Sequence, residues 1–188
     1  MQKETLRQHI LENLSPKRRE HIFAVVNVSK DLARRFGADE EKAELAALLH
    51  DLCREEPMED LNAFVREQGL DPVYLDNENL IHGKKAAWLA EHKYGVTDRE
   101  VLDAVSFHTT GRAGMNTLDK VLYLADAIEP GRAYVGVDRL RELAETDLDE
   151  ACFVALDRTV KYVRTRGKYL DRDTVRARDD IKRNKGKE

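Results

Sequence analysis

Apolar residues recur three and four positions apart in nearly every segment of the chain, and alternating β-branched runs are few. This spacing predicts helices, because it gathers apolar side chains on one face of a 3.6-residue turn. A length of 188 residues suits one domain. We therefore expect an all-α fold in which residues 1–170 form a single domain. Residues 171–188 are rich in charge, and we expect a tail that is partly helical or frayed.

Composition argues against several classes of protein. The 32 Lys and Arg residues against 36 Asp and Glu residues give a net charge of −4, so we expect neither nucleic acid nor a membrane as a partner. The cysteines, Cys53 and Cys152, lack the spacing of a zinc module or a disulfide scaffold, which favours the reducing cytoplasm. No stretch has the apolar length of a signal peptide or a membrane span.

Capping residues predict where the helices begin and end. Ser15 and Asp39 are expected to cap two successive helices, and Gly37 is expected to end the first of them. Thr97 opens a capping-box sequence, and Asn116 is expected to cap a later helix. The apolar side predicted for the first helix consists of Leu6, Ile10, Leu11 and Leu14.

Several histidines and aspartates are predicted to lie on the inward faces or at the ends of otherwise apolar helices. A single residue of this kind is most often a core residue with one hydrogen-bonding neighbour. Several together would need many polar partners, since each unsatisfied buried group costs roughly 1 to 3 kcal/mol, whereas a metal centre satisfies them jointly. Mixed imidazole and carboxylate ligands suit iron, manganese, cobalt or zinc. The candidate ligands are His21, His50, Asp51, His82, His108 and Asp126.

A pair of such ions can lower the pKa of a water molecule and polarise a phosphoryl oxygen, which makes a polyphosphate ester a natural substrate. Nearby cations must then offset the charge of the phosphates. Arg112 and Arg132 are favoured because glycine-containing loops hold them just after two candidate ligands, and we expect Arg112 to act in catalysis. The candidate substrate-binding residues are Lys17, Arg18, Gly83, Lys84, Thr109, Thr110, Gly111, Arg112 and Arg132.

Five segments resemble the HD-domain metal-dependent phosphohydrolases, and the YqeK-like group among them most closely. The resemblance implies a helical bundle with a metal centre between its helices, and that centre is expected to be binuclear iron. It implies that His21, His50, Asp51 and Asp126 hold one ion, and that His82 and His108 hold a second with Asp51 bridging. The segments are SPKRREH (15–21), EKAELAALLHDL (41–52), LIHGKKAA (80–87), FHTTGRAGM (107–115) and LADAIEPGR (124–132).

The resemblance also implies a reaction, the symmetrical hydrolysis of diadenosine tetraphosphate to two ADP. A metal-activated hydroxide would attack an inner phosphorus, with Asp51 as a catalytic residue. One position departs from the pattern, because many HD proteins carry Lys where this chain has Arg54, which keeps the charge but not the shape.

Alternatives to this reaction stay open. The metal ligands do not distinguish diadenosine tetraphosphate from another nucleotide as the substrate. A metal-bound regulatory module without turnover is a second alternative. An HD-type oxygenase is a third, although the groups expected to bind its polyol substrate are not recognisable. The native metal, the base preference and the oligomeric state, a homodimer included, are left open.

Overall fold

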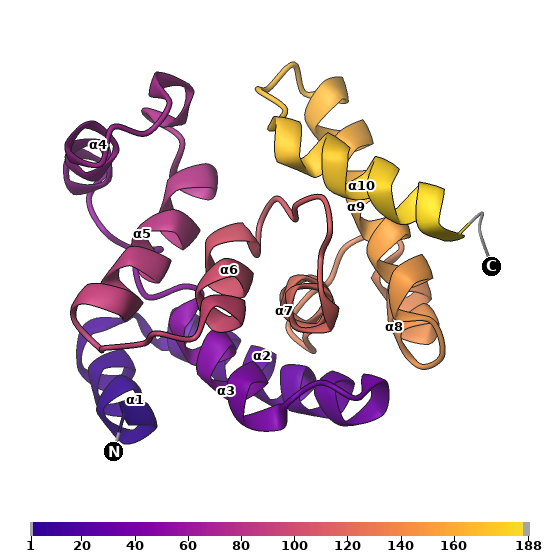
Figure 1. The fold of residues 1–188 in the computed structure, drawn as a ribbon, viewed down its shortest axis with the longest axis horizontal. Coiled ribbons are helices and arrows are strands. Elements are labelled where there is room, and N and C mark those ends of the chain that lie inside the picture. The colour runs from indigo at the N-terminus through magenta and orange to yellow at the C-terminus, as the bar shows by residue number, and fades with distance from the viewer. Residues whose placement is uncertain (1, 186–188) are drawn as a thin grey trace.

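The computed structural model describes residues 2–185, which form ten α-helices and one short 3₁₀ helix (Figure 1). The all-α prediction is confirmed. Within the described residues, none of the helices combines the length and the apolarity needed to cross a bilayer. The elements are α1 (Gln2–Asn13), α2 (Pro16–Phe36), α3 (Glu40–Leu49), α4 (Met58–Glu67), η1 (Pro72–Tyr74), α5 (Glu78–His92), α6 (Arg99–Phe107), α7 (Thr117–Ile128), α8 (Val137–Ala144), α9 (Leu148–Thr165) and α10 (Arg172–Lys185).

Most of the predicted caps are present. The side chain of Ser15 accepts a hydrogen bond from the backbone of α2, and Gly37 ends that helix in the left-handed region with φ 72°. Asp39 accepts two backbone N–H bonds at the start of α3. Asn116 and Asp119 form a reciprocal capping box at the start of α7. These caps set the ends of the helices that carry the site.

Two local predictions are wrong. Asp98, rather than Thr97, is the N-cap of α6, and its carboxylate accepts the Glu100 N–H at 2.9 Å. On α1, Leu11 is 48% exposed. Leu11 lies about 100° around the helix from the buried Ile10, so it leaves the face that packs against α3.

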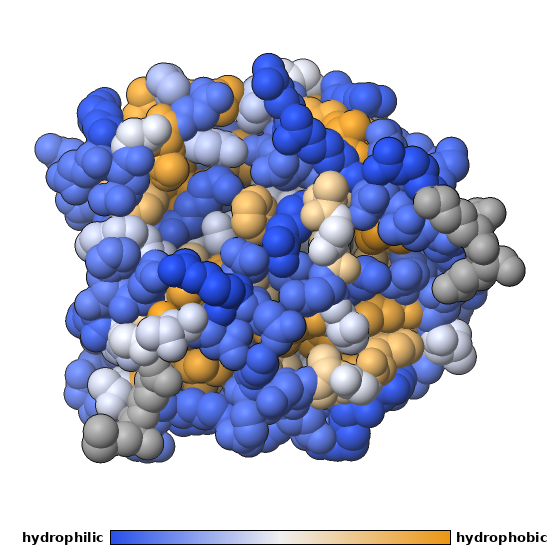
Figure 2. Space-filling view, in the orientation of Figure 1, coloured by the Kyte–Doolittle hydropathy of each residue, from blue (hydrophilic) through white to orange (hydrophobic). Residues whose placement is uncertain are grey.

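The helices pack around one main core and one smaller cluster. In Figure 1, α4 and α5 lie on one side and α8, α9 and α10 on the other, with α6 and α7 between them. Helix α2 packs along both α3 and α7. The smaller cluster joins α4 to α5 through Leu61, Phe64, Val65 and Ile81. Figure 2 shows a mostly hydrophilic face on which hydrophobic residues appear only in separate small areas.

The C-terminal segment is helical where it is described. Helix α10 packs on α9 and buries Thr174, Ala177 and Ile181. Ala177 and Ile181 belong to the same core as the central helices. The rest of the predicted tail, residues 186–188, lies outside the described residues, and the boundary at residue 170 stays a prediction.

Candidate metal centre

The six predicted ligands come together around one carboxylate, that of Asp51. Its Oδ1 atom lies 3.1 Å from His82 Nε2 and 3.9 Å from His108 Nε2. Its Oδ2 atom lies 3.4 Å from the Nε2 atoms of both His21 and His50. Asp126, in the last turn of α7, places Oδ1 3.1 Å from His21 Nε2. The cluster therefore draws on five helices or helix ends.

Backbone contacts orient three of the imidazole rings. The Nδ1 atoms of His50, His82 and His108 lie 2.7, 2.8 and 2.8 Å from carbonyl oxygens three or four residues earlier in the chain. A carbonyl oxygen only accepts hydrogen bonds, so each Nδ1 atom must carry the proton. Each Nε2 atom then turns a lone pair towards the centre of the cluster, as a metal ligand does.

At His82 and His108 two lone pairs face one another. His82 Nε2 is 3.0 Å from His108 Nε2, whereas His50 Nε2 lies 3.4 Å from His21 Nε2, which can carry a proton. Two unprotonated nitrogen atoms repel at such distances unless a cation or a proton lies between them. The donor set therefore fits metal ions. Two groups bring their ligand atoms within 4.8 Å of one another, and both contain Asp51: His21, His50 and Asp51, and Asp51, His82 and His108.

The protonation states also suit a cation. Burial raises the pKa of Asp51, but the interactions with the imidazoles of His50 and His21 outweigh burial and hold it well below its usual range. Burial, together with the neighbouring histidines, lowers the pKa of His108 to about 3, so its ring is neutral. Burial lowers the pKa of His21, but hydrogen bonds to Asp126 and Asp51 raise it to about 9. A metal ion bound at His21 would displace that proton.

Glu129 completes the support of the cluster, and sequence reasoning missed it. Its Oε1 atom lies 3.2 Å from His21 Nδ1, and its Oε2 atom accepts the Gly131 N–H at 2.5 Å. The guanidinium group of Arg141 donates to three backbone carbonyl oxygens between residues 128 and 132, which holds this loop in place. The available signal was an acidic residue three positions after Asp126 in LADAIEPGR.

Two arginines contact the carboxylates of candidate ligands. Arg18 forms an ion pair with Asp51, and Arg132 forms one with Asp126. Both arginines line a cavity of about 650 Å³ on the His21 side of the cluster, together with Lys17 and with the carboxylates of Glu20 and Glu129. The Nε atom of Arg18 is buried and has no hydrogen-bond partner. We call this space the cationic cavity.

Arg112 is held at another place. Its Nη2 atom lies 2.8 Å from Asp119 and its Nη1 atom 3.2 Å from Asp103, and its guanidinium group lies over the ring of Phe107. Arg112 is absent from the lining of both cavities beside the cluster. The structure does not bring it to the ligands, and its catalytic role stays a prediction.

The glycines proposed for substrate binding have packing roles. A Cβ atom at Gly83 would lie 2.9 Å from the ring of His108, so the backbone of α5 lies directly against that ring. Gly111 has φ 64°, and a Cβ atom there would lie 3.0 Å from Ala177 on α10. Both positions need the absence of a side chain.

The other predicted substrate-binding residues lie in two places. Thr109 and Thr110 line a second cavity of about 450 Å³, which also reaches His108 and Asp126. The ammonium group of Lys84 lies 5.1 Å from the ring centre of Tyr74 and 4.7 Å from that of Phe107, and burial lowers its pKa.

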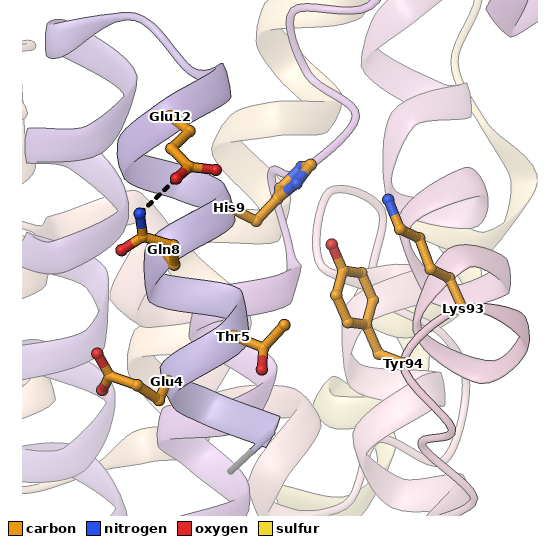
Figure 3. A pocket seen from close by; sticks show the side chains of 7 residues that line it. All are labelled: Glu4, Thr5, Gln8, His9, Glu12, Lys93 and Tyr94. Carbon is orange, nitrogen blue, oxygen red and sulfur yellow. Dashed lines mark hydrogen bonds between the residues drawn. The ribbon is translucent and has the colours of Figure 1, made fainter.

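A further cavity, of about 470 Å³, lies between α1 and the end of α5 (Figure 3). His9 and Tyr94 meet edge to face within it at 6.2 Å. None of the six candidate ligands lines this cavity, so it is separate from the cluster. Its lining consists of Glu4, Thr5, Gln8, His9, Glu12, Lys93 and Tyr94.

The fold and the buried cluster define a metal-dependent hydrolase of the HD type, and residues 18–131 match the HD domain. The symmetrical bis(5'-nucleosyl)-tetraphosphatase of Bacillus subtilis (strain 168) is 39% identical over 166 residues, which cover 88% of this chain and 89% of that protein. The enzyme of the same name from Staphylococcus aureus is 37% identical, over 81% of this chain and 80% of that protein.

A solved structure is also similar. It is the crystal structure of a predicted HD superfamily hydrolase involved in NAD metabolism from Clostridium acetobutylicum. Its TM-score is 0.91 at 36% sequence identity, covering 96% of this chain and 97% of that one. The chain belongs to the HD-domain family, and within it to the YqeK-like group predicted from the sequence.

Proposed function

We propose that this protein hydrolyses diadenosine tetraphosphate symmetrically to two molecules of ADP. The observation that carries the proposal is the convergence of four imidazole Nε2 atoms on the two oxygens of Asp51. The curated relatives, named as symmetrical bis(5'-nucleosyl)-tetraphosphatases, support this substrate.

Two metal sites share Asp51 in this proposal. The first is formed by His21, His50, Asp51 and Asp126, and the second by Asp51, His82 and His108. Iron is the proposed metal, with manganese, cobalt and zinc as alternatives, because all four accept mixed imidazole and carboxylate ligands. When bound, a pair of such ions lowers the pKa of water and polarises a phosphoryl oxygen.

The side chains around the ligands have separate tasks. Asp51 and Asp126 stay ionised, because neighbouring histidines, and Arg132 beside Asp126, lower the pKa of each carboxyl group more than burial raises it. Glu129 orients the ring of His21. Arg18 and Arg132, which face the cationic cavity with Lys17, bind the phosphates and offset their charge.

We also propose that the protein works in the cytoplasm on this small molecule, without nucleic acid or membrane as a partner. The free, buried thiols of Cys53 and Cys152 support a reducing compartment. The net charge of −4 argues against a nucleic-acid backbone as the ligand.

The products of hydrolysis test the proposal. Iron-loaded protein is incubated with a panel of dinucleoside polyphosphates and mononucleotides, and the products are separated by ion-exchange chromatography. Diadenosine tetraphosphate should give only ADP. In ¹⁸O-labelled water, one of the two ADP molecules should carry one label on its terminal phosphate. Equal amounts of AMP and ATP would exclude symmetrical cleavage.

A further inference from the structure

The second cavity differs in character from the cationic cavity. Both reach the cluster, the cationic cavity at His21 and the second cavity at His108 and Asp126. Apart from these two residues, the only charged side chains in the lining of the second cavity are Lys168 and Asp171. A volume of about 450 Å³ suits a small-molecule site, and this lining suits an uncharged group better than a chain of phosphates.

Aromatic rings are exposed at this cavity. Tyr162 on α9 is 54% exposed and Tyr169 is 44% exposed, and both line the cavity. They are two of the four large hydrophobic side chains exposed in residues 3–185, the part of the chain with described side chains. A single exposed ring needs no explanation, but two beside a cluster of metal ligands resemble the stacking surfaces that bind bases.

The segment that carries Tyr169 leads into α10, and contacts of Asp171 and of Ala177 fix this part of the chain. Asp171 is buried at the start of α10, accepts the Asp173 N–H at 2.8 Å and lies beside the phenol of Tyr74. Further along α10, Ala177 packs against Gly111. In Figure 1 the first turn of α10 faces the N-terminal end of α5. Residues 168–171 and Thr174 thus line the same cavity as His108 and Asp126, although they lie outside the matched residues 18–131.

We propose that the second cavity binds one nucleoside of the substrate, with its base stacked on Tyr169 beside Tyr162. This inference rests on the proposed function. A dinucleoside tetraphosphate with its inner phosphates at the cluster directs its two nucleosides away from the cluster in different directions. The cationic cavity and the second cavity then each hold one part of the substrate, and the C-terminal segment supplies the contact to a base.

Binding of two small probes tests this assignment. ADP and inorganic pyrophosphate are titrated calorimetrically into the metal-loaded wild type, Tyr169→Ala and Tyr169→Phe. Tyr169→Ala should weaken ADP binding about tenfold, as expected for a lost stacking contact, and should leave pyrophosphate binding unchanged. Tyr169→Phe keeps the ring and should stay within about threefold of the wild type. Leu11→Ala, at a similarly exposed position on α1, is the control.

Kinetics separate this inference from the proposed function. If the wild type cleaves diadenosine tetraphosphate to ADP, Tyr169→Ala should raise KM about tenfold. Unchanged ADP binding in that variant, or an equal loss for ADP and pyrophosphate, would overturn the stacking role while the hydrolase function stands. A wild type that leaves diadenosine tetraphosphate intact and binds ADP no more tightly than pyrophosphate would overturn both.

Discussion

The Nε2 atoms of His82 and His108 face each other at 3.0 Å, while the Nδ1 atom of each ring is bound to a backbone carbonyl oxygen of its own segment. The rings are thereby held in one tautomer and one orientation by α5 and α6. Two nitrogen donors are thus in place before an ion arrives, which reduces the free-energy cost of organising the site.

Asp51→Ala should abolish metal binding at both sites, because both proposed ligand sets contain this carboxylate. Loss of groups that merely support a ligand typically costs about 10- to 100-fold, so loss of a shared ligand should lower turnover by more than about 100-fold. Metal analysis and steady-state rates check this, with Asp157→Ala on α9 as the control. Full metal content in Asp51→Ala would refute the assignment.

Chelation of the metal from the wild type should lower Tm, because the ions bind the folded chain.

Glu129→Gln should weaken the first metal site without removing a ligand. The amide accepts a hydrogen bond from His21 Nδ1 less strongly than the carboxylate does, so we expect a loss of about 10- to 100-fold in metal affinity or rate. Metal titration followed by activity measures the effect. Glu142→Gln, on the exposed face of α8, should behave like the wild type. Equal behaviour of the two variants would show that Glu129 does not act on His21.

Arg132→Ala should lower activity, whereas Arg112→Ala should lower stability. Arg132 faces the cationic cavity, so its loss should lower kcat/KM by roughly 100-fold at unchanged metal content. Arg112 neutralises the buried Asp119, so its loss should lower the free energy of unfolding by about 1 to 3 kcal/mol. Parallel kinetics and thermal melts decide this. A large loss of kcat/KM with unchanged Tm in Arg112→Ala would support the catalytic role predicted from the sequence.

Gly83→Ala should displace the ring of His108, since the new methyl group would lie 2.9 Å from it. Such overpacking typically costs about 1 to 3 kcal/mol, and the second ion should bind less tightly. Gly95→Ala is a matched control, because its φ of 65° makes alanine strained there without any neighbour nearby. Both variants should lose stability, and only Gly83→Ala should lose metal. Equal metal content in the two would contradict the packing role of Gly83.

Glu44 should make stability depend on pH in the acid range. Burial raises its pKa, but ion pairs with Lys3 and Arg7 lower it from an ordinary value of 4.5 to about 2. A carboxyl group with a lowered pKa stabilises the fold fully above pH 4.5, and this contribution disappears as the pH falls towards 2. Allowing for the partial exposure of both partners, Glu44→Gln should cost about 1 to 2 kcal/mol at pH 7. Urea unfolding at several pH values should show that, in the acid range, the free energy of unfolding of the variant depends less on pH than that of the wild type. The same pH dependence in both proteins would disprove the effect.

The sequence predicts the helices and the meeting of the ligands because both depend on short-range patterns. Apolar spacing determines which face of a helix is buried, and a cap needs only a few neighbouring residues, as at Ser15 and Asn116. His21, His50 and His108 interrupt apolar faces, so they must meet wherever those faces pack. The exposure of Leu11 could not be predicted in the same way, because it depends on how far α3 covers α1.

Long-range partners account for the other differences. Glu129 reaches back to His21 across 108 positions of the chain, and no local pattern reports that contact. Arg112 and Arg132 look alike in sequence, since each follows a candidate ligand and a glycine. Asp103 and Asp119 hold the first, whereas Asp126 draws the second to the cluster. Only the folded chain distinguishes them.

The ends of three helices point to one more property of the cluster. His50 and His108 are the C-caps of α3 and α6, and Asp126 lies in the last turn of α7. The C-terminal end of a helix carries a partial negative charge from its aligned peptide dipoles. Cations are therefore favoured here by the backbone itself, and an anionic tetraphosphate is disfavoured until ions and arginines reverse the local potential. Metal loading should accordingly come before substrate binding.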